Sequence, residues 1–376
     1  MPSSAEAVRN AIERIAPLEH AEDWDNVGEL IRGSRDSVKR LFLTIDFTEP
    51  VLEEAIEKKC DMVIAYHPTI FKPVTRLGAV VSTERVILGT ARAGIHLYSP
   101  HTALDAAPGG TNDWLAASLG PGDRRALVPS KINQDGDLCK IVTFCPAEAT
   151  DRIRDGLAAV GAGIIGNYKR CSFELHGSGT FHGNEESDPK VGTSGRLERV
   201  GETRLEMVCP STILPGAIRA LASFHPYEEP PIEIYTLESV PVRESGPGRR
   251  VVLDRGKSLN AIANSIKSRS EASEVRIARA YDRPRQHKII GLCVGSGGDL
   301  LNDAIAQGST VFITGEMSHH DLLKAQSSGC TVILVGHTET ERCYLPVLAE
   351  RLSEELGNSC PKIIISRQDR PPLRKG

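Results

Sequence analysis

The clearest indication of the fold is the stretch TVILVGHTETER, residues 331–342. Residues 332–335 are apolar and mostly β-branched, and they run without a polar break into Gly336. A run of this length and composition is typical of a strand buried on both faces, as in a parallel sheet. Open α/β sheets bind ligands beyond the carboxyl ends of such strands, so His337 and Glu341 are candidates for a site.

The same pattern recurs in both outer thirds of the chain, with helical patterns between the apolar runs. These runs are RLFLTID at 40–46, MVIAYH at 62–67, GIHLYS at 94–99, KIIGLCVG at 288–295, TVFITGE at 310–316 and KIIIS at 362–366. Alternating strands and helices build parallel sheets with helices on their faces. We therefore expect the outer thirds to form one discontinuous, two-lobed α/β domain.

The middle third has a different pattern. Two strands close on Cys-Pro, KIVTFCP and RLEMVCP, and they precede predicted helices at 150–160 and 213–224, each followed by a further strand. This weak internal repeat predicts an inserted α+β domain of ferredoxin-like type. The flanking stretches PSKINQDGD and ESVPVRESGPGRR have the composition of linkers. The predicted bounds are 1–133 joined to 247–376 for the outer domain and 137–240 for the insert.

Composition argues against several classes of protein. The chain has 376 residues, a net charge of −4, no apolar stretch long enough for a membrane span and no long basic run, which argues against membranes and nucleic acid as partners. Its nine cysteines are scattered without a Cys-x-x-Cys pair, which favours a reducing compartment. The first residues lack the apolar centre of a secretory signal. We expect a cytoplasmic protein, with the nucleus and the mitochondrion left open.

Four stretches end an apolar run with side chains that can bind a metal. They are AYHPTIF with His67, SPHTALD with His101 and Asp105, TGEMSHHD with Glu316, His319, His320 and Asp321, and VGHTETE with His337 and Glu341. The carboxyl ends of parallel strands meet at one edge of a sheet, so these stretches are expected to converge. Imidazoles and carboxylates gathered there would destabilise one another unless a cation balanced the charge.

Each stretch also has a purely local interpretation. Ser318 and Asp321 have the spacing of a helix cap, Thr338 and Glu341 have the spacing of a capping box, and His67 precedes a proline as in a turn. Pro346 would kink a helix that began at Thr338. We therefore expect Thr338 to cap its helix alone, with His337 and Glu341 turned toward the metal.

Imidazole and carboxylate ligands without a nearby cysteine indicate zinc, iron, manganese or nickel. The set is large enough for two divalent transition-metal ions if one carboxylate bridges them, and a paired site that activates bound water points to hydrolysis.

Three other stretches are weaker candidates. CVGSGGDLL at 293–301 is a glycine-rich turn that could contact phosphate, although it lacks the Walker lysine. WDNVGEL at 24–30 is either a structural turn or part of a cleft lining. In the insert, FHPYEEPPIEIY at 224–235 is either a binding stretch or a rigid edge.

Together these motifs closely resemble the NGG-one-interacting-factor-three-like family, whose bacterial members are called GTP cyclohydrolase type 2 homologs. The matching stretches are WDNVGEL, YHPTIF, SPHTALDAAPGGTNDWLA, GSGG, TGEMSHHD and GHTETER, and the insert resembles that of the longer bacterial members. The resemblance implies a two-metal site between two lobes and a homo-hexamer. It assigns as metal ligands His67, Asp105, His337 and Glu341, with Glu341 bridging, and it places His101 as a ligand or a neighbour of one.

One position departs from the family pattern. Many bacterial members have two adjacent histidines where this chain has Tyr66 and His67. A phenol binds divalent ions less readily than an imidazole at neutral pH, so one metal position is expected to be weaker.

Two functions follow as hypotheses. The first is a metal-dependent hydrolase, cyclohydrolase-like or phosphohydrolase-like, and the second is a non-enzymatic protein with structural metals whose insert docks protein partners. No residue points to guanine recognition.

Overall fold

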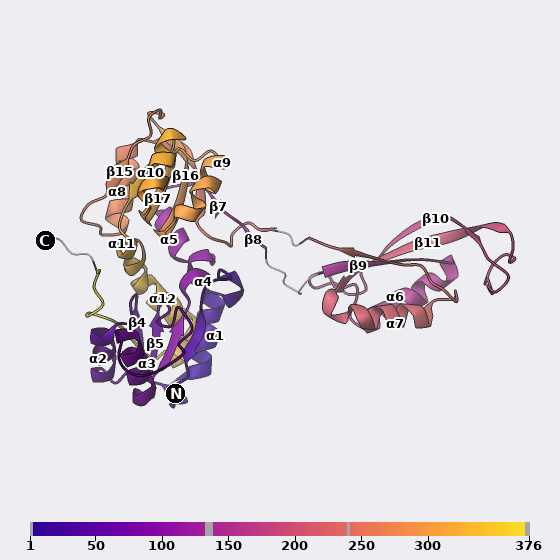
Figure 1. Cartoon of the computed structure of the whole chain (residues 1–376), viewed down its shortest axis with the longest axis horizontal. Helices are drawn as coiled ribbons and strands as arrows, with labels where there is room; N and C mark the ends of the chain where they lie inside the picture. The colour runs from indigo at the N-terminus through magenta and orange to yellow at the C-terminus, as the bar shows by residue number, and fades with distance from the viewer. Residues whose placement is uncertain (1–2, 132–137, 239–240, 373–376) are drawn as a thin grey trace. The chain divides into compact units, whose positions relative to one another are not determined.

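The computed structural model describes residues 3–131, 138–238 and 241–372, which form two compact units (Figure 1). The first unit joins residues 1–130 to 242–376, and the second spans residues 131–241. The predicted mixture of α/β lobes and an α+β insert is confirmed. The predicted domain bounds, 1–133 with 247–376 and 137–240, stay a prediction. No helix among the described residues is long and apolar enough to cross a membrane.

One sheet of the first unit has five strands. Its order is β19 (Lys362–Ile365), β4 (Arg40–Thr44), β5 (Met62–Ala65), β6 (His96–Ser99) and β2 (Gly28–Ile31), with all neighbours parallel except β2. Successive side chains of β4 point to opposite faces, so Phe42 packs with α2 (Glu49–Glu57) and α3 (Ser82–Ala93), whereas Leu41 packs with α1 (Ala5–Ile15) and α12 (Leu345–Leu356). Helices on both faces explain the continuous apolar runs of these strands.

The second sheet of this unit has six strands. Its order is β15 (Arg276–Ala278), β18 (Thr331–Leu334), β17 (Val311–Glu316), β16 (His287–Ser296), β14 (Arg249–Lys257) and β7 (Gly122–Ala126), and only β16, β17 and β18 pair in parallel. Helices α5 (Thr111–Ala117) and α8 (Leu259–Arg269) contribute to the core on one face, and α9 (Leu301–Ala306) and α10 (His319–Ser327) to the core on the other. One buried cluster contains residues of both sheets, so the two lobes share a core.

The predicted cap at Thr338 is wrong. Helix α11 spans His337–Glu341 and its N-cap residue is Gly336, which has a φ of 113° and no side chain to donate or accept. A capping box would need an oxygen-bearing side chain at that position. Pro346 causes no kink, because the turn Arg342–Tyr344 separates α11 from α12 and the proline lies in the first turn of α12. The local interpretation of Ser318 applies, because Ser318 is the N-cap of α10 and its hydroxyl accepts a hydrogen bond from the Asp321 amide.

The second unit has the ferredoxin-like order of elements. It runs β9 (Leu138–Cys145), α6 (Thr150–Ala159), β10 (Phe173–His182), β11 (Leu197–Pro210), α7 (Leu214–Phe224) and β12 (Ile232–Thr236). Its antiparallel sheet has the strand order β10-β11-β9-β12, and α6 and α7 pack with it around one buried cluster. The edge strand β10 carries Phe173 and Leu175, which are 61% and 57% exposed.

Candidate metal centre

The candidate ligands come from strand ends in both lobes of the first unit. His67 follows β5, His101 begins α4 (His101–Ala106) after β6, and His337 begins α11 after β18. The residues therefore lie beyond the carboxyl ends of the strands, as the sequence predicts.

His67, His337 and Glu341 have donor atoms that all lie within 4.8 Å of one another. The Glu341 carboxylate places Oε1 3.2 Å from His337 Nε2 and Oε2 3.5 Å from His67 Nε2. Glu341 is buried, and its Oε2 atom accepts no hydrogen bond from the part of the chain that the structure describes. A buried carboxylate with one oxygen beside each of two imidazole nitrogens, and with Oε2 lacking a donor, fits a divalent cation, because the ion would bind the carboxylate and both nitrogens.

Each of three histidines is held by a carboxylate at its Nδ1 atom. The pairs are His67 with Asp46 at 2.9 Å, His337 with Glu316 at 3.0 Å, and His101 with Asp25 at 2.9 Å. Such pairs fix the orientation of an imidazole and leave Nε2 free to bind a metal. The pairing of Asp46 and Asp25 with these histidines was not predicted, although Asp46 ends the run RLFLTID and Asp25 lies in WDNVGEL.

The carboxylates change the protonation of the site. Burial opposes protonation of His67, but Asp46 and Glu341 raise its pKa to about 10. The contact with Glu341, opposed by burial, raises the pKa of His337 to about 9. Burial would raise the pKa of Glu341, but the two imidazoles hold it below its usual value. Without a metal, this centre therefore holds protons where the ion would bind.

Asp105 and His101 lie at the same cavity but outside the group of three. The hydroxyls of Tyr66 and Thr111 both donate to Asp105 Oδ1, and burial raises the pKa of this carboxyl to about 6. Tyr66, the residue that departs from the family pattern, is thus a hydrogen-bond donor to a predicted ligand. His101 has a positive φ of 27°, a strained conformation that is frequent at functional sites.

The glycine-rich stretch at 293–301 packs closely against Glu341 of the candidate centre. A Cβ at Gly295, which has a φ of 60°, would lie 2.6 Å from Glu341 Oε1, so only glycine lets β16 approach this close. The amides of Gly295 and Gly297 donate to the hydroxyls of Thr340 and Thr314. These two amides are therefore occupied, which weakens the interpretation of this turn as a phosphate loop.

TGEMSHHD contributes one residue to the centre. Glu316 contacts His337, whereas His319 and His320 are exposed at the start of α10. Asp321 interacts with Ser318 at the helix cap.

A cavity of about 530 Å³ opens beside the candidate ligands. Two exposed aromatic side chains stand at it, Trp24 at 61% and Phe71 at 49% exposure, with ring centroids 6.0 Å apart. The Trp24 ring also meets the His101 ring edge-on at 6.1 Å. Of the stretch WDNVGEL, Trp24 lines this cavity, in keeping with one of the two roles considered for it.

The model of the family Duf34/NIF3 (NGG1p interacting factor 3) matches residues 3–372. The chain belongs to this family. Among its relatives, NIF3-like protein 1 of Bos taurus is 35% identical, with 98% of this chain and 91% of the relative covered. GTP cyclohydrolase 1 type 2 homolog of Bacillus subtilis is 31% identical, with 96% and 95% covered.

Solved NIF3-family structures have the same fold. A Bacillus cereus protein related to NIF3 is 27% identical, with a TM-score of 0.68 and full coverage of both chains. A Staphylococcus aureus protein is 26% identical, with a TM-score of 0.78 and coverage of 100% of this chain and 99% of that one. The predicted family is therefore confirmed, and in this NIF3-family chain His67, His337 and Glu341 form a possible metal-binding triad.

Proposed function

We propose that this NIF3-family protein is a metal-dependent hydrolase with two divalent transition-metal ions, held by His67, His101, Asp105, His337 and Glu341. The observation that carries the proposal is the buried Glu341 carboxylate between two imidazoles, each fixed by a further carboxylate. Such ions, when bound, lower the pKa of water and polarise the bond to be hydrolysed. The names of the bacterial relatives also point to hydrolysis of a ring.

Other residues of the chain would hold the metal ligands in fixed orientations. Asp46 and Glu316 hold the two imidazoles in place, so little reorganisation is needed during the reaction. Tyr66 and Thr111 fix Asp105 through its Oδ1 atom, which restricts that carboxylate to its other oxygen for further contacts.

The cavity favours a substrate with a planar ring. Trp24 and Phe71 offer apolar ring faces beside the metal centre, and aromatic pairs prefer tilted or offset contacts with a ligand ring. A cavity of about 530 Å³ has room for a small heterocyclic compound. We expect Trp24→Ala to raise KM by roughly tenfold, since a stacked ring contributes about 1–3 kcal/mol.

The test combines metal analysis with hydrolysis. Purified protein is analysed by inductively coupled plasma mass spectrometry and assayed on a panel of heterocycles, nucleotides and phosphate esters, including GTP. Glu341→Gln should lose both metal and activity, whereas the exposed Glu350→Gln on α12 serves as the matched control. Native protein without transition metal, or full activity in Glu341→Gln, would refute the proposal.

A non-enzymatic interaction function is the second candidate. The exposed Phe173 and Leu175 on the edge strand β10 favour it, because apolar side chains on an unpaired edge commonly mark a contact surface. The family name also records an interacting factor. Deletion of 137–240 tests it, since an unchanged set of partners in pull-downs would exclude docking by the insert.

The homo-hexamer implied by the family resemblance is likewise a proposal. Light scattering coupled to size exclusion measures it directly, and a monomeric mass at working concentration would contradict it.

A further inference from the structure

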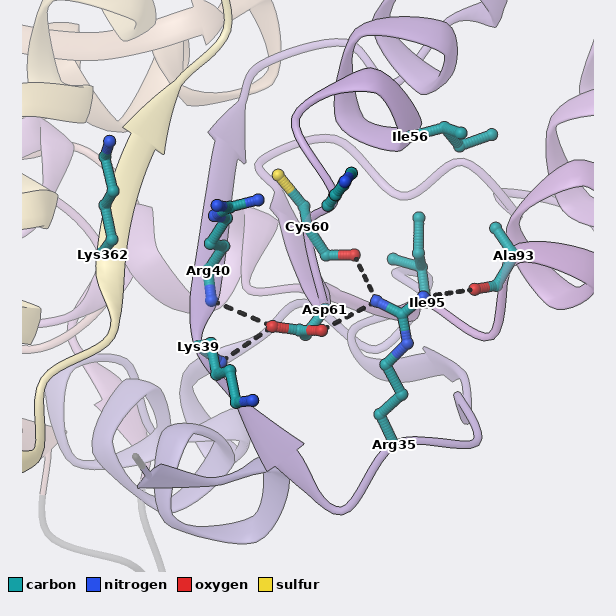
Figure 2. A pocket seen from close by; sticks show the side chains of 10 residues that line it. Arg35, Lys39, Arg40, Ile56, Cys60, Asp61, Ala93, Ile95 and Lys362 are labelled. Atoms are coloured by element: carbon teal, nitrogen blue, oxygen red, sulfur yellow. Dashed lines mark hydrogen bonds and ion pairs between the residues drawn. The ribbon is translucent and has the colours of Figure 1, made fainter. Parts of the chain in front are cut away.

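A second cavity of the first unit, of about 450 Å³, is lined by cationic side chains. Figure 2 shows this pocket, which lies at the amino ends of β4, β5 and β19. The metal centre lies beyond the carboxyl ends of β4 and β5, at the opposite edge of the same sheet. The cationic residues of the pocket are Arg35, Lys39, Arg40, Lys59 and Lys362, and Asp61 is its one carboxylate.

Two of the five cations and the carboxylate have structural roles. Asp61 accepts hydrogen bonds from Arg35 Nη1 at 2.7 Å and from the amides of Lys39 and Arg40 at 2.8 and 3.0 Å (Figure 2). Arg35 also binds the carbonyl of Ala93 at the end of α3, and Arg40 Nη1 binds the carbonyl of Lys58 at the end of α2. Helix carboxyl ends attract cations, so these two guanidinium groups are accounted for.

The three ammonium groups have no such explanation. In residues 3–131, 138–238 and 241–372, no carboxylate forms an ion pair with Lys39, Lys59 or Lys362. Lys362 and Arg40 are register partners on the parallel strands β19 and β4, so their side chains leave the same face of the sheet. A concentration of unpaired positive charge is notable in a chain whose net charge is −4.

The floor of the pocket is apolar. Ile95 and Cys60 are buried, and Ile56, at 46% exposure, lines the pocket with them. Burial raises the pKa of the Cys60 thiol to about 11, so the thiol is neutral at physiological pH. Cations above an apolar floor match a ligand with an anionic group and an apolar body, and the cavity has the size of a small-molecule site.

We propose that this pocket binds a small organic phosphate ester, with its phosphate between Lys59, Lys362 and the free nitrogen of Arg40 and its organic part on Ile56 and Ile95. Lysine ammonium groups bind phosphate as point charges and arginine through directed hydrogen bonds, so the lining has the donors that a phosphate monoester needs. This site is separate from the metal centre, and it does not depend on the proposed hydrolase activity.

The test is calorimetric titration of the full chain with phenyl phosphate, inorganic phosphate and phenol. We expect phenyl phosphate to bind most tightly, inorganic phosphate to bind more weakly because it leaves the floor uncovered, and phenol not to bind. The double variant Lys59→Gln/Lys362→Gln should lose roughly tenfold in affinity for each ammonium removed. Both lysines are exposed, so the variant is expected to fold, and a thermal melt verifies this.

The matched control is Lys58→Gln. Lys58 is the exposed neighbour of Lys59, pairs with Glu57 and does not line the pocket. Its replacement removes one positive charge, as each lysine substitution of the double variant does. Lys58→Gln should bind phenyl phosphate as the native chain does. The proposal is overturned if the native chain shows no saturable binding, if the double variant binds normally, if Lys58→Gln loses as much, or if inorganic phosphate binds as tightly as the ester. Normal binding by the double variant would mean that phenyl phosphate binds outside this pocket.

Discussion

Without the proposed metal ions, the stability of the first unit should depend on pH. The pKa values of His67 and His337, about 10 and about 9, both exceed the ordinary imidazole value of 6.5. A group whose pKa is raised in the folded state stabilises that state fully below its unfolded pKa and loses this contribution as pH rises through its folded pKa. The window for the metal-free protein therefore runs from pH 6.5 to about 9 or 10.

The magnitude follows from the number of protons involved. As pH rises through this window, each imidazole that is protonated in the folded state but not in the unfolded one causes the free energy of unfolding to fall by about 1.4 kcal/mol per pH unit. The His337 side chain is 35% exposed, so solvent screening reduces its pKa shift and shortens the pH range over which it contributes. The free energy of unfolding should therefore fall by about 3 kcal/mol per pH unit where both imidazoles contribute, and by about 1.4 kcal/mol per pH unit where His67 alone does.

Urea unfolding followed by tryptophan fluorescence measures this effect. The only two tryptophans, Trp24 and Trp114, both lie in the first unit, so the signal reports on that unit alone. Metal-free protein should show the slope, and protein saturated with zinc should be nearly flat, because the ion replaces the protons. Glu341→Gln removes a carboxylate that acts on both imidazoles and should reduce the slope by about half. A flat profile for the metal-free native chain, or an unchanged slope in Glu341→Gln, would refute the reasoning.

Three further predictions test other parts of the structure. Zinc binding at pH 7 should release about two protons, because the imidazoles of His67 and His337 must each lose a proton to bind the ion. Calorimetry in buffers of different ionisation enthalpy measures this number, and a value near zero would show that the imidazoles were already neutral. Tyr66→His should raise the metal content per chain measured by mass spectrometry, because imidazole binds divalent ions more readily than phenol, and Tyr66→Phe, which also loses the bond to Asp105, should not. Asp113→Ala should destabilise the first unit by about 3–5 kcal/mol, because it leaves the buried Arg249 without its carboxylate, whereas Asp123→Ala, which removes the exposed pair with Arg243, should cost under about 1 kcal/mol in the same urea assay.

The sequence predicted the strands well because their burial has a local signature. The runs RLFLTID, MVIAYH and TVILVGH correspond to β4, β5 and β18, each covered by helices on both faces. The ferredoxin-like insert was also predictable, because the sequence contains the pattern of strand, helix and strand twice in succession. Burial on two faces and internal repetition both leave patterns within a few residues.

Helix starts were less predictable, because the capping pattern of Thr338 and Glu341 is a matter of spacing alone. The backbone instead turns at Gly336, and Glu341 faces His337 on the same helix and His67, which follows a strand far away in the chain. A local pattern could not show that competing contact. The ligand role of Asp105 and His101 stays a prediction.

The carboxylates behind the imidazoles were missed for a related reason. Asp46 and Asp25 touch His67 and His101 across 21 and 76 residues of sequence. Nothing in the sequence near either aspartate marks it as a partner of a histidine. The partner becomes visible only when the strand ends are placed side by side.

The two cavities of the first unit are expected to act independently. Strand β4 connects them, with Arg40 at its amino end by the cationic pocket and Asp46 just beyond its carboxyl end at His67. Six residues of strand separate these positions by roughly 20 Å. Coupling over that distance needs an element with two alternative arrangements. β4 is instead buried between helices and paired with a strand on each side. It therefore has no alternative arrangement through which binding at one end could affect the other end. Loss of the lysines should therefore leave metal content unchanged.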